Sequence, residues 1–157
     1  MENPFNTQEN TPKRSTLLTV LLVLTFIGSG FTFIGNGYTS LFFENVVGLV
    51  EEAADDDSFA TLGALLDQAV KNMEKVGAGY FGFLSLLALI SLAGAVLMWK
   101  LNKLGFHLYA SAQLVLLFIP MVFGLVKFPG VFETLITALF IWLYARELKI
   151  FVRNVQE

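Results

Sequence analysis

The sequence predicts an all-α integral membrane protein, a four-helix bundle with an amphipathic helical segment between its first two spans. Of the 157 residues, 55% are hydrophobic and 15% are charged, whereas a soluble domain carries roughly a quarter charged residues. No Asp, Glu, Lys or Arg occurs in Ser15–Phe43, Val76–Trp99 or Leu104–Val126. Each interval exceeds the about 20 residues that a helix needs to cross a bilayer. Their residues are apolar on every face, which favours helices over the alternating strands of a membrane barrel.

The chain begins with a polar segment, residues 1–15, which we expect to be flexible. The first span is expected over residues 16–38. Lys13 and Arg14 precede it, as basic residues precede a secretory signal peptide, but the uncharged run continues to Phe43 and no A-x-A pattern follows. We therefore expect this span to remain in the mature chain.

The segment 44–77, between the first and second spans, is acidic, with eight acidic residues and two lysines. Apolar residues recur at steps of three and four from Phe59 to Val76, and three valines share one side of 44–54. This pattern predicts one or two short amphipathic helices that lie on the membrane or over the bundle. The acids lack the alternating ligands and central glycine of a calcium-binding loop, so no metal site is predicted here.

The second and third spans are separated by a short turn, and short connections join antiparallel neighbours. The fourth span is the shortest and contains Glu133. A short C-terminal tail is expected over 148–157. The last three spans are expected at 78–99, 104–125 and 129–146, and with the first they form a membrane domain over 16–147.

With four spans, the loops and tails on one side of the membrane hold more basic residues than those on the other. Basic residues generally concentrate on the cytoplasmic side of membranes. The stretches LTVLLVLTFIGSGF and KLNKLGFHLYASAQL resemble small bacterial membrane proteins without indicating a family. We therefore expect a bacterial cytoplasmic (inner) membrane, with both termini in the cytoplasm and the acidic loop outside. One face holds Lys13, Arg14, Lys100, Lys103, Arg146, Lys149 and Arg153, and the other holds only Lys71, Lys75 and Lys127.

Four polar residues are candidates for a ligand or ion pathway: Glu133, Gln113, Asn36 and His107. Glu133 follows Pro129 by about one helical turn, where the helix dipole favours an anion, so we interpret it as an interfacial charge. An ion-coupling carboxylate is the alternative. His107 is expected to form interfacial hydrogen bonds, with a proton relay as its alternative. Gln113 is expected to join two helices by hydrogen bonding, unless it lines a small cavity beside the kink at Pro120.

Small residues form one stripe in the first span and another in the second. Because lipid provides no hydrophobic drive for helix pairing, such residues allow the close contact that holds helices together. We expect the two stripes to pack against each other. The alternatives are packing against a partner protein or a second copy, and a groove lined by Thr25, Thr32 and Asn36. The first stripe contains Thr25, Gly28, Thr32 and Gly35, and the second contains Gly82, Ser85 and Ser91.

The composition excludes several classes of function. The chain has no cysteine and one histidine, so it cannot form thiol redox centres or a multi-histidine metal site on its own. It has no nucleotide-binding glycine motif, no nucleophile–base motif and no basic tract for nucleic acid. We predict no catalytic residue, no metal and no cofactor, and no partner among nucleic acids.

The leading hypothesis for the function is a non-enzymatic accessory or interaction subunit of a membrane complex. Its partners would be the lipid bilayer and either another membrane protein or further copies of this chain. The alternative is a small oligomeric transporter or channel that uses Glu133, Asn36 and Gln113. Convergence of these three side chains on one cavity would favour transport, and separation would count against it.

Overall fold

The structure is a computed structural model that describes the backbone of residues 15–55 and 62–156, with side chains as far as Glu147. The predicted flexible segment 1–15 falls, except for Ser15, outside the described residues. The described part of the chain is all-α. Its helices are α1 (Thr16–Leu41), α2 (Phe43–Asp55), α3 (Gly63–Trp99), α4 (Leu104–Val122) and α5 (Val131–Gln156).

Three helices, α1, α3 and α4, are long and apolar enough to cross a membrane. Their length and composition indicate a membrane protein. Most of the predicted fourth span, 129–146, falls within α5, which is not among these three helices in the part of the chain that the structure describes. This helix also continues through the predicted tail 148–157 as far as Gln156.

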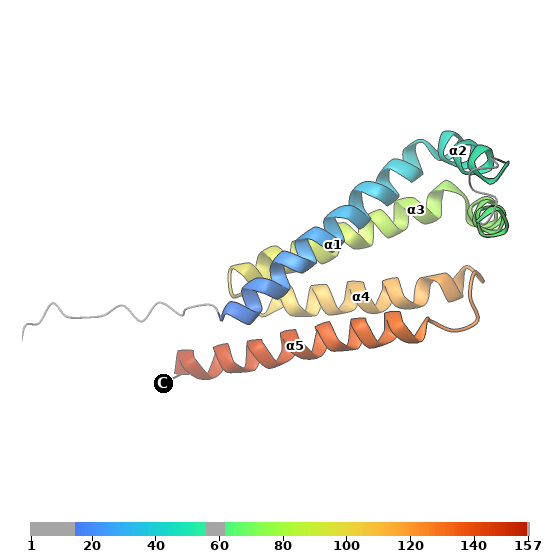
Figure 1. The fold of residues 1–157 in the computed structure, drawn as a ribbon. Coiled ribbons are helices and arrows are strands. Elements are labelled where there is room, and N and C mark those ends of the chain that lie inside the picture. The colour runs from blue at the N-terminus through green and yellow to red at the C-terminus, as the bar shows by residue number, and fades with distance from the viewer. Residues whose placement is uncertain (1–14, 56–61, 157) are drawn as a thin grey trace, which may run out of the picture.

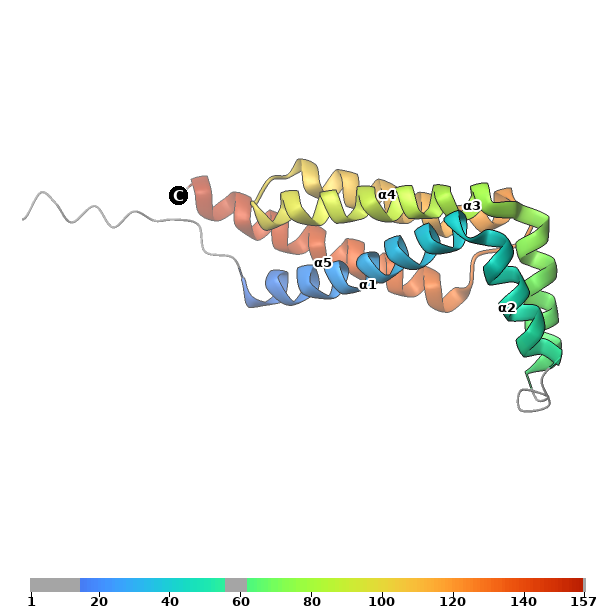
Figure 2. The ribbon, with the colours of Figure 1, turned by 90° about the horizontal axis from the view of Figure 1, so that it is seen from above.

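The long helices run alongside one another, with α3 at the centre of the packing (Figures 1 and 2). The two most extensive helix–helix contacts are those of α3 with α1 and with α4. α5 lies beside α4 and contacts α1 and α4 much more sparsely. In Figure 1, α1 diverges from α5 towards the end of the bundle that carries α2.

A helical hairpin projects from that end of the bundle, and we call it the arm: α2 together with residues 63–76 of α3. Figure 2 shows the arm turned across the direction of the long helices. The turn occurs at Gly77, whose φ of 69° and ψ of 175° interrupt the helix. Glycine adopts positive φ without the steric cost of a Cβ, so this residue permits the change in direction. Buried Val47 and Val70 stabilise the pair of helices.

A hydrogen bond links the arm to the connection between α4 and α5. The Nζ of Lys75 donates a hydrogen bond of 2.6 Å to the carbonyl oxygen of Gly124, in the connection between α4 and α5. Gly124 itself has a φ of 65°, which a glycine accepts at the end of α4. Within the described residues, the predicted helical segment 44–77 contains most of α2 and the first part of α3, which continues into the second predicted span.

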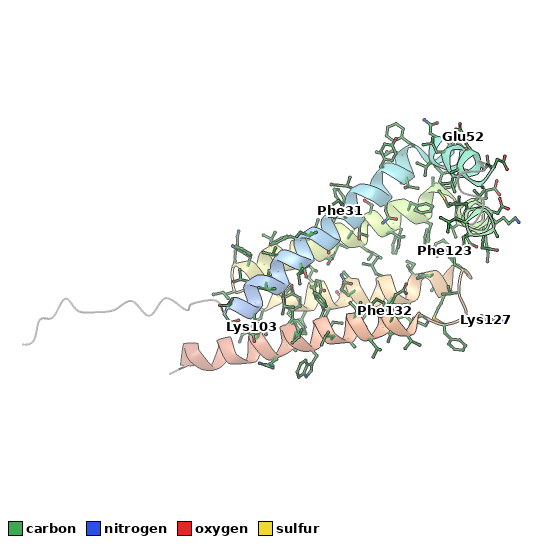
Figure 3. All side chains as sticks on the ribbon, in the orientation of Figure 1. Phe31, Glu52, Lys103, Phe123, Lys127 and Phe132 are labelled. Atoms are coloured by element: carbon green, nitrogen blue, oxygen red, sulfur yellow. The ribbon has the colours of Figure 1, made fainter. Side chains whose placement is uncertain are left out.

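Two apolar clusters form the core. The larger joins α1, α3, α4 and α5 near the 100–103 turn, and it includes Leu22, Met98 and Tyr144, all fully buried. The smaller joins α3 to α4 through Leu87 and Ile119, near the arm. Large apolar side chains also cover the outside of the bundle: Phe31 is 76% exposed and Phe132 is 75% exposed (Figure 3). A lipid environment accounts for such a surface, because it removes the cost of contact with water.

Candidate functional site

A cavity of about 240 Å³ lies between α1, α3, α4 and α5. Its polar lining comes mainly from hydroxyl groups and one amide, and no Asp, Glu, Lys, Arg or His contributes to it. An uncharged lining in an apolar surrounding suits an uncharged occupant, because an unpaired charge there would cost several kcal/mol. The polar lining residues are Thr25, Ser29, Thr32, Tyr109, Gln113 and Thr137, and the apolar ones include Leu24, Leu116, Ile136 and Phe140.

A chain of hydrogen bonds links three helices at one wall of the cavity. The Nε2 of Gln113, on α4, donates to the Oγ of Ser91, on α3, over 3.0 Å. The Oγ of Ser91 also lies 3.0 Å from the Oγ of Ser29, on α1. Ser91 is fully buried, and such a group must find partners inside the protein. These bonds therefore hold α1 and α4 in register against α3.

A second polar contact joins α1 to α5. The hydroxyl of Thr25 lies 2.7 Å from the hydroxyl of Tyr144, and the Tyr144 ring meets the Tyr109 ring edge-on at a centroid distance of 5.0 Å. Tyr144 is fully buried and Thr25 is 5% exposed. Two members of this cluster, Thr25 and Tyr109, line the cavity.

Glu147 on α5 is buried near the start of α1, where its carboxylate accepts a hydrogen bond from the hydroxyl of Ser15. The same Ser15 Oγ accepts from the backbone N–H of Leu18 and caps α1. A carboxylate at this position is also favoured by the positive end of the α1 dipole. The middle of α5 is thus fixed to the N-terminal half of α1 through Tyr144 and Glu147.

The four predicted pathway residues do not converge. Gln113 lines the cavity. Asn36 donates through Nδ2 to the carbonyl oxygen of Thr32, 2.8 Å away on the same helix, and does not line the cavity. Glu133 lies in the exposed first turn of α5. His107 is exposed in the first turn of α4, with its ring against Phe106.

The predicted packing residues of α3 face α1. Ser85 donates to the carbonyl oxygen of Phe33 over 3.0 Å, Ser91 meets Ser29, and a Cβ on Gly82 would lie 2.9 Å from the Oγ of Ser40. The small residues of α3 therefore form the face that packs against α1.

On α1 the contacting face differs from the predicted stripe. The contacts with α3 run through Ser29, Gly37 and Ser40, whereas a Cβ on Gly28 or Gly35 would meet no heavy atom within 4 Å. Three residues of the predicted stripe line the cavity instead: Thr25, Gly28 and Thr32. A helix turns by about 100° per residue, so a shift of one position is enough to separate these faces.

Several residues of this region were not predicted as site residues. Gly94 and Gly105 place the backbones of α3 and α4 in direct contact, since a Cβ on either would approach backbone atoms to 2.8 Å or less. Tyr144, Glu147 and Thr137 lie on α5, and nothing in the linear pattern distinguished them from their neighbours.

Within the residues that the structure describes, no three His, Asp or Glu side chains are placed to hold a metal ion together. The cavity brings several polar groups together beside apolar side chains, a combination that is common in binding sites. Comparisons of the chain with protein-family models, with curated proteins and with solved structures found no match.

Proposed function

We propose that the protein is a non-enzymatic accessory or interaction subunit of a membrane complex. The observation that carries this proposal is the arm, which extends outside the bundle and presents a strongly acidic surface. All of its described acids are exposed: Glu44, Glu51, Glu52, Asp55, Asp67 and Glu74. Packing within the bundle does not require this surface, so a role in contact with another molecule explains it best.

The proposal includes four spans, with α5 as the fourth, in a bacterial cytoplasmic (inner) membrane. Both termini are then cytoplasmic and the arm is extracytoplasmic. In support, Glu52 and Lys127 lie at the end of the bundle opposite to Lys103 (Figure 3). The threading predicted from the sequence assigns seven basic residues to the Lys103 side and three to the other, and the cytoplasmic side favours the more basic one.

The partner that suits the arm is a membrane protein with a basic extracytoplasmic surface. Complementary charge increases the rate of encounter and fixes the orientation of two proteins. Leu49 and Leu65, which are 61% and 68% exposed on the arm, supply apolar contact beside the acids. Interfaces combine these two features, with an apolar centre and a polar rim.

The alternative function, a small oligomeric transporter or channel, has less support. It requires Glu133, Asn36 and Gln113 to serve one pathway, and only Gln113 lines the cavity. Uptake of a solute into vesicles by the purified chain, lost in Glu133→Gln, would favour this alternative.

Purification in mild detergent from native membranes tests the proposed function. The wild-type chain should retain a membrane protein in fixed stoichiometry, and the double variant Glu51→Lys, Glu52→Lys should lose it. The matched control is Lys103→Glu, a charge reversal at the opposite end of the bundle, which should keep the partner. Elution of the wild-type chain without a partner, or equal retention by the arm variant, would contradict the proposal.

A further inference from the structure

We propose that the cavity between α1, α3, α4 and α5 binds a small, uncharged amphipathic molecule that enters from the lipid phase. This inference is independent of the arm and of the proposed accessory role. It depends on the size of the cavity, on its lining and on its position among the helices.

The volume sets the size of the ligand. A cavity of about 150 Å³ lined by apolar residues is large enough for benzene. At about 240 Å³, this cavity has room for about ten non-hydrogen atoms by the same proportion. That is the size of a medium-chain alcohol or a substituted phenol, and it is too small for a whole membrane lipid.

Two groups in the lining are available to bind a polar head. Gln113 uses its amide nitrogen to reach Ser91, which leaves its carbonyl oxygen as an acceptor. Thr137 lines the cavity from α5, and its hydroxyl has no hydrogen bond to another residue in the described part of the chain. Each of these two groups can therefore exchange a hydrogen bond with the hydroxyl of a ligand in the cavity.

The apolar residues of the lining suit the tail of the same ligand. Leu24, Leu116, Ile136 and Phe140 provide this surface. Because no charged group is present among the lining residues, a charged head would lose its hydration without compensation. The site therefore selects a neutral molecule that has one polar end and one apolar end.

Access to the cavity is from the side, between α1 and α5. Leu24 and Ile136 both line the cavity, and they are 49% and 41% exposed. α1 and α5 contact each other sparsely and diverge towards the arm (Figure 1). Gln113 and Ser29 lie near the middle of their helices, so this opening meets the hydrocarbon core and not the aqueous phase.

Photolabelling of the full-length chain in phosphatidylcholine vesicles tests the site, with a photoreactive diazirine derivative of octanol as the probe. Adducts mapped by mass spectrometry should fall on the cavity-lining parts of α1, α4 or α5. Excess octanol should protect these positions, whereas excess octane, which has no hydroxyl, should not. Protection by octane equal to that by octanol, or adducts spread over the lipid-facing surface without protection, would overturn the proposal.

Two pairs of variants sharpen the test. Gly28→Leu places a side chain in the cavity without meeting a neighbouring atom at Cβ, and it should abolish the protected adducts. Gly35→Leu, equally free of neighbours but outside the cavity, should leave them unchanged. Adducts in Gly28→Leu at the wild-type level would count against binding in the cavity.

Thr137→Val keeps the shape of the side chain and removes the hydroxyl, so it tests the polar contact without filling the cavity. It should raise the octanol concentration needed for half-protection by about two- to tenfold, the usual effect of one hydrogen bond. Thr134→Val is its control on the same helix, because the Thr134 hydroxyl is bonded to the carbonyl oxygen of Gly130 and does not line the cavity. Equal half-protection in the two variants would exclude the assigned role of Thr137.

Discussion

The contact between Thr25 and Tyr144 shows how single polar groups position α5. Their hydroxyls are 2.7 Å apart, and both side chains are buried. α5 has few other contacts with α1, so this bond and the one between Ser15 and Glu147 position the middle of α5 against α1. A hydrogen bond to a hydroxyl buried in an apolar core stabilises the folded state, and removal of its partner destabilises the folded state.

We expect Tyr144→Phe to reduce the free energy of unfolding by about 0.6–1.7 kcal/mol, the range from average to largest for hydrogen bonds within membrane proteins. The phenylalanine ring keeps the contact with Tyr109 and removes only the hydroxyl. Unfolding of the detergent-solubilised chain by a denaturing detergent measures the difference. Tyr38→Phe is the control, since Tyr38 is 53% exposed. A Tyr144→Phe variant as stable as this control would show that the bond contributes nothing.

At the scale of helices, glycine decides where two backbones approach each other. Gly94 on α3 and Gly105 on α4 face each other across the short turn, and a Cβ on Gly94 would lie 2.8 Å from the carbonyl oxygen of Gly105. Backbone atoms cannot move aside as the end of a flexible side chain can. In a membrane, this close approach supplies the van der Waals contact that substitutes for hydrophobic drive.

Gly94→Ala and Gly105→Ala should therefore each destabilise the chain, by about 1–3 kcal/mol or more, because the added methyl group forces the helices apart. The same unfolding measurement reports the loss. Gly35→Ala introduces the same methyl group into α1 where no heavy atom lies within 4 Å, and it should be neutral. If all three variants unfold alike, the close approach of α3 and α4 is not a determinant of stability.

At the scale of the whole molecule, the arm and the turn between α3 and α4 lie at opposite ends of the bundle (Figures 1 and 3). A four-span threading places these ends on opposite sides of the membrane. It also returns the C-terminus to the side of the 100–103 turn, whereas a chain with three spans would leave it on the side of the arm. The side of the membrane on which the C-terminus lies therefore distinguishes four spans from three.

Because the chain contains no cysteine, single cysteines report their side directly. A membrane-impermeant maleimide added to intact cells should label Glu52→Cys and Lys127→Cys from outside. Asn102→Cys, and a cysteine appended after Glu157, should react only after the membrane is opened. Reaction of Glu52→Cys and Asn102→Cys from one side would contradict the threading as a whole, and reaction of the appended cysteine from outside would remove the fourth span alone.

The all-α class and the three apolar helices could be predicted from the sequence because they depend on linear properties. The charge-free intervals that are long enough to cross a bilayer correspond to α1, α3 and α4. In lipid, backbone N–H and C=O groups need partners within the chain, and a helix provides them. Gln113 could be identified for a similar reason: a strongly polar side chain in an apolar run needs a partner. Its partner, Ser91, required the structure, as did the distinction between Gln113 in the cavity and Glu133 outside it.

The sequence by itself determined that these helices form and that the solvent around them is lipid. The tertiary structure alone decided how each helix is rotated: Ser29 and Gly37 face α3, while Gly28 and Thr32 line the cavity. Pairings such as Ser15 with Glu147, at a separation of 132 residues, follow from that rotation. The physical reason is that lipid is as apolar as the helix surface, so hydrophobicity does not choose the buried face, and close packing and hydrogen bonding choose it instead.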